Sequence, residues 1–276
     1  MLATVFGARK EAAHRPSVRA PRERAMAGRG PMSFTGPGNY REEAAKTIRD
    51  KPEVRTSITA ATRTFDAHRV HAWGQIDADR WRDWARDVKS HVLGHLDEYL
   101  EQAEEQLTAN GAHVHWAETA EDALAILGDI VREHGVESAV KAKSMLSEEL
   151  GVNAHLESLG VHVRETDLGE YIIQLAEETP SHLVAPALHK SKEDVAELFT
   201  EKLGIPYDDD IFHMAATART VLRDKFMEAD LGISGANFVV AETGTLVIFT
   251  NEGNGRLCTS APRIHIGITG MEKVIP

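Results

Sequence analysis

From Gly111 onward, short runs rich in β-branched residues alternate with segments that have the apolar spacing of helices. Glycine follows several of these helical segments, as it does at many helix ends. This alternation is typical of an α/β sheet. The predicted strands are residues 113–116, 138–141, 161–165, 171–175 and 182–186. The predicted helices are residues 121–134, 147–159 and 192–203.

A β-hairpin is predicted in the last fifth of the chain. Two β-branched runs, residues 237–241 and 245–250, flank the short turn Glu242-Thr243-Gly244. Such runs around a glycine-containing turn favour antiparallel pairing. Because the preceding strand–helix units favour parallel pairing, we expect a mixed sheet flanked by helices.

Residues 40–110 have a helical pattern almost throughout. Within them, residues 77–106 place apolar side chains at three- and four-residue steps, which predicts one long amphipathic helix. Asp77 and Asp79 are candidate N-caps, and Asn110-Gly111 is a stop signal. The chain therefore has a predicted N-terminal helical arm.

Two tryptophans, Trp81 and Trp84, lie on the apolar stripe of this arm. Aromatic side chains at helical spacing are more often packing anchors than cofactor contacts. We therefore expect both to pack rather than to stack on a cofactor.

The first 38 residues are basic and rich in Pro, Gly and Ala, with Glu11 and Glu23 as the acids. So little core-forming content predicts a disordered basic extension and no packed element. A start codon placed too early, with Met26 or Met32 as the alternative start, also explains this composition. The expected organisation is an extension over 1–38, a helical segment over 39–110 and an α/β domain over 111–276.

Composition excludes several classes of protein. The 276-residue chain has one cysteine, Cys258, which excludes an internal disulfide framework and any cysteine-ligated metal cluster held by this chain alone. A net charge of −12 argues against a nucleic-acid partner. No window approaches the roughly 20 apolar residues that cross a bilayer. A reducing cytoplasm is therefore the expected location.

Polar residues that follow predicted strands are candidate ligand contacts, because open α/β sheets bind ligands at the carboxyl ends of their strands. Lys141, Lys143 and Ser144 lie between a predicted strand and a helix. Two lysines and a hydroxyl there would suit a small anion such as a phosphate or carboxylate. An ordinary solvated loop is the alternative, since the glycines of a phosphate-binding loop are missing.

Two further groups follow predicted strands. Glu165, Asp167 and Glu170 are close enough in sequence to repel one another, raise a pKa or hold a cation, although a solvated acidic turn also explains them. His182 is a candidate contact, but a lone histidine is usually structural. His91 and His95 have a zinc-like spacing without a third ligand, so no metal site is predicted.

The hairpin loops carry the densest polar group, with glycines that would let backbone approach a ligand. A buried polar network that braces two loops is the alternative interpretation. The candidate residues are Asn237, Glu242, Thr243, Asn251, Glu252 and Asn254, and Arg256 lies beside them.

A series of motifs in order resembles the lactate-utilisation protein B family, over about residue 40 to the last residue. The motifs are KAKSM at 141–145, ETDLGEY at 165–171, PSHLVAPALH at 180–189, ADLGISGANF at 229–238, AETGT at 241–245, NEGNGR at 251–256 and HIGITGMEK at 265–273. The resemblance implies a LUD domain, with a fold similar to the NagB/RpiA/CoA-transferase-like α/β group. It also implies sister subunits, LutA-like and LutC-like, that together oxidise L-lactate to pyruvate.

One departure from the family limits what the resemblance implies. Family members continue into a ferredoxin-like region whose cysteines bind two [4Fe–4S] clusters, and this chain ends before any such cysteine. We therefore expect no cofactor in this chain and interpret it as the LUD part alone, from a split gene, a truncated reading frame or a deliberately shortened chain. The resemblance assigns no catalytic residue.

Two functions remain open from the sequence. The first is the LUD module of a lactate-oxidising electron-transfer complex, supplying ligand binding and subunit docking. The second is a free-standing enzyme resembling a CoA-transferase or a sugar-phosphate-binding protein. In that enzyme Glu165, Glu170 or Glu242 would act as nucleophile or base, and the two lysines would hold a phosphate.

Overall fold

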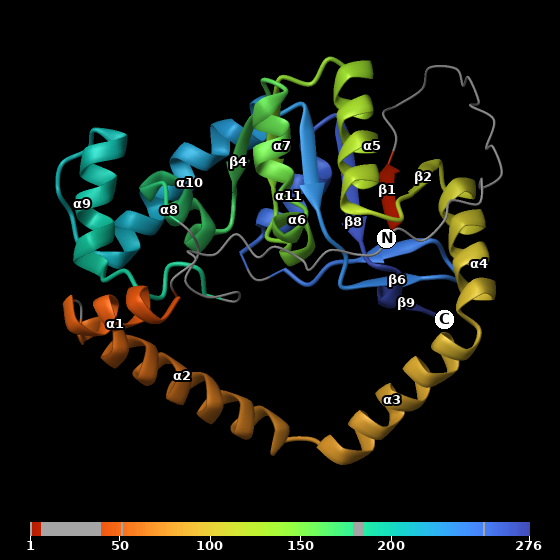
Figure 1. Ribbon diagram of the computed structural model, residues 1–276, viewed down its shortest axis with the longest axis horizontal. Coiled ribbons are helices and arrows are strands. Elements are labelled where there is room, and N and C mark those ends of the chain that lie inside the picture. Colours follow the sequence, from red (N-terminus) through yellow and green to blue (C-terminus); the bar gives the residue numbers. More distant parts are fainter. Residues whose placement is uncertain (1, 7–39, 51, 179–184, 251) are drawn as a thin grey trace. The chain divides into compact units, whose positions relative to one another are not determined.

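The computed structural model describes residues 2–6, 40–50, 52–178, 185–250 and 252–276 (Figure 1). The chain divides into two compact units, residues 10–67 and the remainder. The described part of the smaller unit consists of α1 (Tyr40–Asp50) and the first part of α2 (Pro52–Trp73). All of the features below belong to the larger unit.

A six-stranded mixed sheet forms the centre of the larger unit, in the order β2-β1-β8-β5-β3-β4. Four strands, β8, β5, β3 and β4, run parallel, and β1 lies antiparallel to both of its neighbours. The strands are β1 (Leu2–Phe6), β2 (Ala112–Trp116), β3 (Ser138–Lys141), β4 (His162–Glu165), β5 (Leu231–Ser234) and β8 (Ile264–Thr269). The predicted mixed α/β architecture is confirmed.

Strand β1 is a departure from the sequence prediction, which expected no packed element in residues 1–38. The run LATVF pairs with β2 on one side and β8 on the other. Its apolar and β-branched residues suit a strand, but they precede a long basic stretch that dominates the composition of the segment. Residues 7–39 lie outside the described residues.

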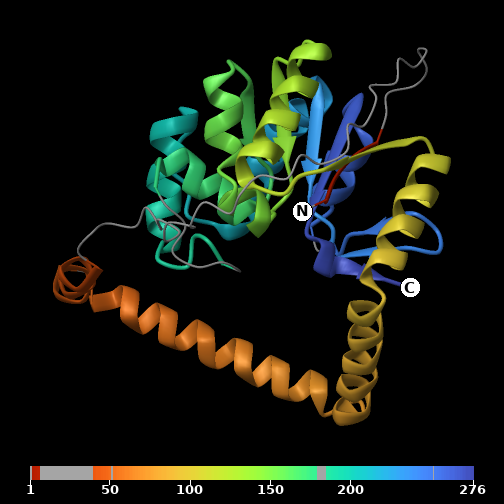
Figure 2. The same ribbon diagram turned by 45° about the vertical axis from the view of Figure 1, so that its right-hand side comes forward.

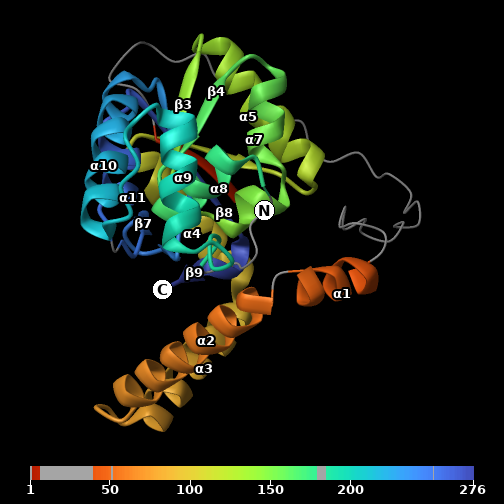
Figure 3. The ribbon, with the colours of Figure 1, turned by 90° about the vertical axis from the view of Figure 1, so that its left-hand side faces the viewer.

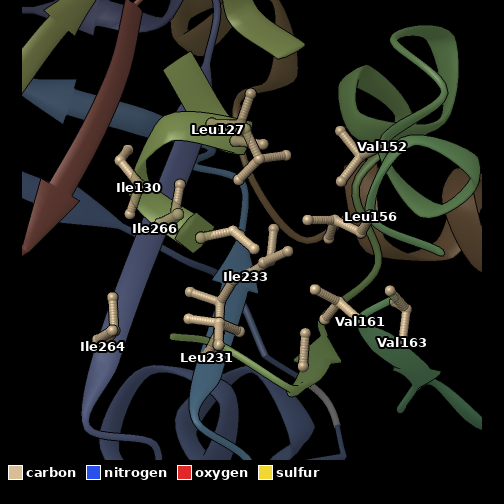
Figure 4. Packing of buried hydrophobic residues seen from close by; sticks show 14 of the residues in the cluster. Leu127, Ile130, Val152, Leu156, Val161, Val163, Leu231, Ile233, Ile264 and Ile266 are labelled. Carbon is tan, nitrogen blue, oxygen red and sulfur yellow. The ribbon is translucent and has the colours of Figure 1, made fainter. Parts of the chain in front are cut away.

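Helices cover both faces of the sheet (Figure 3). One face carries α5 (Ala120–Glu133), α6 (Met145–Glu149) and α7 (Val152–Ser158). Leu127 and Ile130 of α5 pack there against Ile233 and Ile266 of the central strands (Figure 4). Burying aliphatic side chains on this scale is the main source of stability for such a sheet.

The opposite face carries α8 (Leu168–Ala176), α9 (Lys192–Leu203), α10 (Ile211–Glu228) and α11 (Asn254–Ser260). Helix α11 lies so close to β5 that a Cβ atom on Gly232 would be 1.7 Å from the carbonyl oxygen of Cys258. Only glycine fits at that point of the strand.

A second sheet has three strands, in the order β7-β6-β9. The predicted hairpin is confirmed as β6 (Phe238–Val240) and β7 (Thr245–Val247), and β9 (Val274–Ile275) runs parallel to β6 after a short 3₁₀ turn, η1 (Met271–Lys273). Helix α4 (Leu96–Ala109) lies beside this sheet (Figure 2). Its Ala103 and Leu107 pack in one cluster with Val239 of β6 and Val274 of β9.

Two predicted helices are each interrupted. The helix predicted over residues 77–106 is α3 (Ala78–Gly94) followed by α4, with the break at His95. The helix predicted over 147–159 is α6 followed by α7, separated at Gly151, whose φ is 70°. The N-cap Asp77 is confirmed, because its side chain accepts a hydrogen bond from the Arg80 amide at 3.2 Å.

The strand predicted over residues 171–175 is wrong, because these residues lie within α8. Asp167 caps this helix by accepting hydrogen bonds from the amides of Gly169 and Glu170. The buried run Tyr171–Ile173 has no polar residue to mark its period, and a short apolar run fits a strand or a buried helix equally well. Residues 182–184 of the last predicted strand lie outside the described residues.

The arm tryptophans do not pack in a core. Trp81 is 51% exposed and Trp84 is 59% exposed, and their rings contact each other edge to face with centroids 5.6 Å apart. The helical stripe that carries them is real, but within the described residues it has little apolar surface to cover it. The prediction that both are packing anchors is therefore wrong.

Candidate functional site

A cavity of about 980 Å³ opens at the carboxyl ends of the parallel strands. Its inner wall is formed by Ala142 after β3, Ser234 at the end of β5 and Thr269 at the end of β8. We call this space the strand-end cavity. Its place at the strand ends is the one expected for a ligand site in an open α/β sheet.

The rim of the strand-end cavity is acidic on balance. Helix α6, the chain after β7, η1 and the α3–α4 junction all contribute to it. Its cationic lining residues are Lys143 and Lys273, and its acidic ones are Glu118, Glu149, Asp167, Glu252 and Glu272. A free anion would therefore meet more repulsion than attraction at this rim.

The sequence-predicted residues divide into three sets. Six line the strand-end cavity: Lys143, Ser144, Asp167, Asn237, Glu252 and Asn254. Five do not line it: Lys141, Glu165, Glu170, Glu242 and Thr243. The remaining two, His182 and Asn251, lie outside the described residues.

Lys141, Glu165 and Glu170 form a buried charge cluster. Lys141 is 1% exposed, and its Nζ lies 3.0 Å from Glu165 Oε1. Because β3 and β4 pair in parallel with Lys141 opposite Glu165, the sheet register itself brings the two charges together. Asn153 of α7 donates a hydrogen bond to the same oxygen, Glu165 Oε1, at 2.6 Å.

Glu170 completes the cluster in its neutral form. Burial, followed by the neighbouring Glu165 carboxylate, raises the pKa of Glu170 to about 10. None of the described residues donates a hydrogen bond to either of its buried oxygens, whereas a protonated Glu170 can donate to Glu165. The raised pKa was one of three outcomes that the sequence allowed for these carboxylates.

Several cavity-lining residues also have local structural roles. Ser144 caps α6, because its Oγ accepts a hydrogen bond from the Ser147 amide at 3.3 Å. Asn237 Oδ1 accepts one from the Phe249 amide at 2.8 Å, across the base of the hairpin. Bracing of this kind supports the structural interpretation of the hairpin residues.

The hairpin turn itself packs on α4 rather than on the cavity. A Cβ on Gly244, whose φ is 59°, would lie 2.5 Å from the α4 backbone at Gln106. Asn110 Nδ2 donates to the carbonyl oxygen of Thr243 at 2.8 Å. The glycine at this position therefore allows close packing of the turn against α4 and not against a ligand. Glu242 and Thr243 lie exposed beside it.

Iron–sulfur ligation does not fit these residues. Cys258 is buried, and burial raises the pKa of its thiol to about 11. Among the described residues, no group of three or more His, Cys, Asp or Glu side chains is arranged to hold a metal ion. Helices long and apolar enough to cross a membrane are likewise missing from the part of the chain that the structure describes.

Comparison with known proteins relates the chain to one family. The profile of the LUD domain matches residues 100–276. Lactate utilization protein B of Bacillus licheniformis is 42% identical over 243 residues, which cover 87% of this chain and 51% of the relative. An uncharacterized electron transport protein of Escherichia coli, YkgF, is 39% identical over 239 residues, covering 86% of this chain and 50% of the relative.

The chain spans about half the length of the curated relatives that it matches. No solved structure matches it. The profile nonetheless covers well over half of the chain, including β2 to β9 and most of the residues that line the strand-end cavity. The chain therefore belongs to the LUD domain family.

Proposed function

We propose that this chain is the LUD module of an L-lactate-oxidising electron-transfer complex, supplying a ligand cavity and docking surfaces. The observation that carries the proposal is the identity of about 40%, over most of this chain, with proteins named lactate utilization protein B. A relative named as an electron transport protein has nearly the same identity.

The strand-end cavity supports the ligand-binding part of the proposal. Its volume of about 980 Å³ is at the upper end of the range for small-molecule sites. Four parallel strands with an opening at their carboxyl ends also agree with a NagB/RpiA/CoA-transferase-like fold, which we propose for this domain.

Iron–sulfur clusters would have to reside outside these residues. A [4Fe–4S] cluster needs four cysteine thiolates, and the sequence has one cysteine, which is buried. The division of labour we propose is ligand binding and docking here, with iron–sulfur clusters held by other sequence in the complex.

The exposed stripe of α3 supports the docking part. Trp81 and Trp84 are each more than half exposed, and exposed tryptophans are frequent anchors of protein interfaces. Sister lactate-utilisation subunits, LutA-like and LutC-like, are the partners we propose for this surface.

The second candidate function, a CoA-transferase-like enzyme, receives less support from the geometry. Its proposed nucleophiles Glu165 and Glu170 are buried away from the cavity lining, and Glu242 lies on the hairpin turn. Lys141, proposed to hold a phosphate, is instead paired with Glu165. An acyl group would have no path to Glu165 or Glu170 without rearrangement of the cluster.

Deletion of the gene with its neighbours intact tests the proposal. We expect growth on L-lactate to be lost and growth on pyruvate to be unaffected, because only the oxidation step is missing. Restoring the gene on a plasmid should restore growth on L-lactate. Unchanged growth of the deletion strain on L-lactate would contradict the proposed function.

A further inference from the structure

A second cavity adjoins the strand-end cavity. It encloses about 490 Å³ and is lined by Thr245, Thr250, Arg256, Thr259 and His265, among others. We call it the hairpin cavity. It shares Ile248, Thr250 and Gly255 with the strand-end cavity, so the chain after β7 lines both spaces.

The charges of the two cavities differ in sign. Among the described residues that line the hairpin cavity, Arg256 carries the net charge and none is a carboxylate. Burial lowers the pKa of His265 to about 4, so this imidazole is neutral at physiological pH. The net charge of the chain is −12, so a cavity with a cationic lining differs from the overall charge of the protein and would attract an anion locally.

Arg256 is available to a ligand. Its side chain makes no hydrogen bond or ion pair within the described part of the chain, whereas Arg263, three residues beyond the end of α11, is paired with Asp230 at 3.2 Å. An exposed guanidinium presents several N–H donors in a planar fork that matches a carboxylate or phosphate.

Hydroxyl donors lie beside this guanidinium. Thr245 Oγ1 accepts a hydrogen bond from Thr243 at 2.9 Å, which leaves its own hydroxyl hydrogen for a ligand. Thr250 has no hydrogen bond from its side chain within the described residues, so its hydroxyl can donate as well. His265 closes the inner wall, held by a 2.8 Å hydrogen bond between its Nε2 and Ser234 Oγ.

We propose that the hairpin cavity binds the anionic group of a small organic acid or phosphate ester through Arg256, with the threonine hydroxyls as additional donors. The volume exceeds that of an isolated phosphate and falls within the range of small-molecule sites. The anion that the sequence led us to expect at Lys141 and Lys143 is thereby assigned to a different place.

Calorimetric titration of the purified chain tests this assignment. The carboxylate probes are L-lactate and pyruvate, the phosphate probes are inorganic phosphate and glycerol phosphate, and lactamide is the uncharged control. We expect millimolar binding of at least one anion, none of lactamide, and weaker binding at high salt. Arg256→Gln should lower the affinity about tenfold or more, because a charge-assisted hydrogen bond is lost.

A matched variant tests whether the effect is specific to the hairpin cavity. Arg223→Gln removes another exposed arginine, on α10 and outside the lining of both cavities, and should leave affinity unchanged. Wild-type affinity in Arg256→Gln, an equal loss of affinity in Arg223→Gln, or no binding of any anion would each overturn the proposal. Phosphate binding without carboxylate binding would support the hairpin cavity as an anion site, and the lactate function would still stand or fall by the growth test.

Discussion

The buried charge cluster and the strand-end cavity both contain polar residues from the ends of strands. The cluster is closed to solvent, whereas the cavity is open to it. Lys141 and Lys143 are two residues apart at the end of the same strand, β3. Lys141 is 1% exposed and paired with Glu165, while Lys143 lines an open cavity of about 980 Å³. Polar residues after a strand can therefore serve the fold or face a ligand, and solvent access decides which.

The difference follows from where each strand ends. Lys141 is the last residue of β3, in register with Glu165, so its side chain is held beside its neighbour in the sheet. Lys143 lies beyond the pairing, next to the cap of α6. An unpaired charge in the buried cluster would strongly destabilise the domain, whereas a charge in the open cavity wall remains in contact with solvent.

The largest expected effect separates the two lysines. Lys141→Met should destabilise the domain by about 3 to 5 kcal/mol, because it leaves the buried Glu165 carboxylate without its counter-ion. Lys143→Met should change stability by about 0.5 kcal/mol or less. Urea denaturation of both variants measures the difference, and equal stabilities would contradict the sealed-cluster description.

A smaller effect is expected from the neutral carboxyl of the cluster. The pKa of Glu170 rises from 4.5 to about 10 on folding, so the folded chain holds a proton that the unfolded chain releases between these values. The free energy of unfolding should therefore fall as pH rises through this window. Glu170→Gln keeps a neutral side chain at every pH and should be about 1 to 3 kcal/mol more stable than the wild type at pH 9.

The control for that variant is Glu165→Gln. It removes the charge that pairs with Lys141 and should destabilise the domain at pH 7, where Glu170→Gln should not. Urea midpoints between pH 5 and pH 9 give both comparisons. A wild-type midpoint that rises with pH over this range would show that Glu170 is ionised in the folded chain.

The smallest expected effect concerns the solvent accessibility of the Cys258 thiol, which labelling measures with little change in stability. Cys258 is buried, and its Sγ lies 3.5 Å from Thr166 Oγ1 beside the cluster. A neutral thiol reagent should leave it unmodified in the folded chain and react after denaturation. Glu252→Cys, in the exposed cavity lining, should react at once. Rapid labelling of Cys258 in the native chain would mean that the cluster is open.

Sequence periodicity was enough to predict the main architecture. It was less useful for short apolar runs, because a strand and a buried helix can have the same pattern. The strand–helix alternation and the hairpin were predicted because β-branched runs and glycine stops mark them directly. The run Tyr171–Ile173 was predicted as a strand because it is apolar throughout. The residue that starts a helix here is the N-cap Asp167, but in the sequence it cannot be distinguished from the other polar residues beside it.

Helix α10 was not predicted, although a signal for it exists. Met214, Ala218, Leu222 and Phe226 are its buried residues, at a regular spacing of four. That stripe is narrow, and the charged and polar residues between its members weaken the contrast between faces.

Candidate site residues were identified by residue type and position after strands, but their roles depended on three-dimensional pairing. Nothing in KAKS distinguishes a lysine that pairs with Glu165 from one that lines a cavity. The hairpin cavity was missed because Arg256 and His265 come from separate elements, α11 and β8. Only the folded chain brings them to one space.

The central claim is that the open strand-end cavity, rather than the sealed cluster, serves the lactate function. Glu149→Trp places a large side chain at the cavity rim, and Glu157→Trp makes the same change at an exposed position of α7 outside the cavity. Both should fold, because both residues are exposed. In the deletion strain, we predict that Glu157→Trp restores growth on L-lactate and that Glu149→Trp, present at the same level, does not. Full growth with Glu149→Trp would contradict the claim.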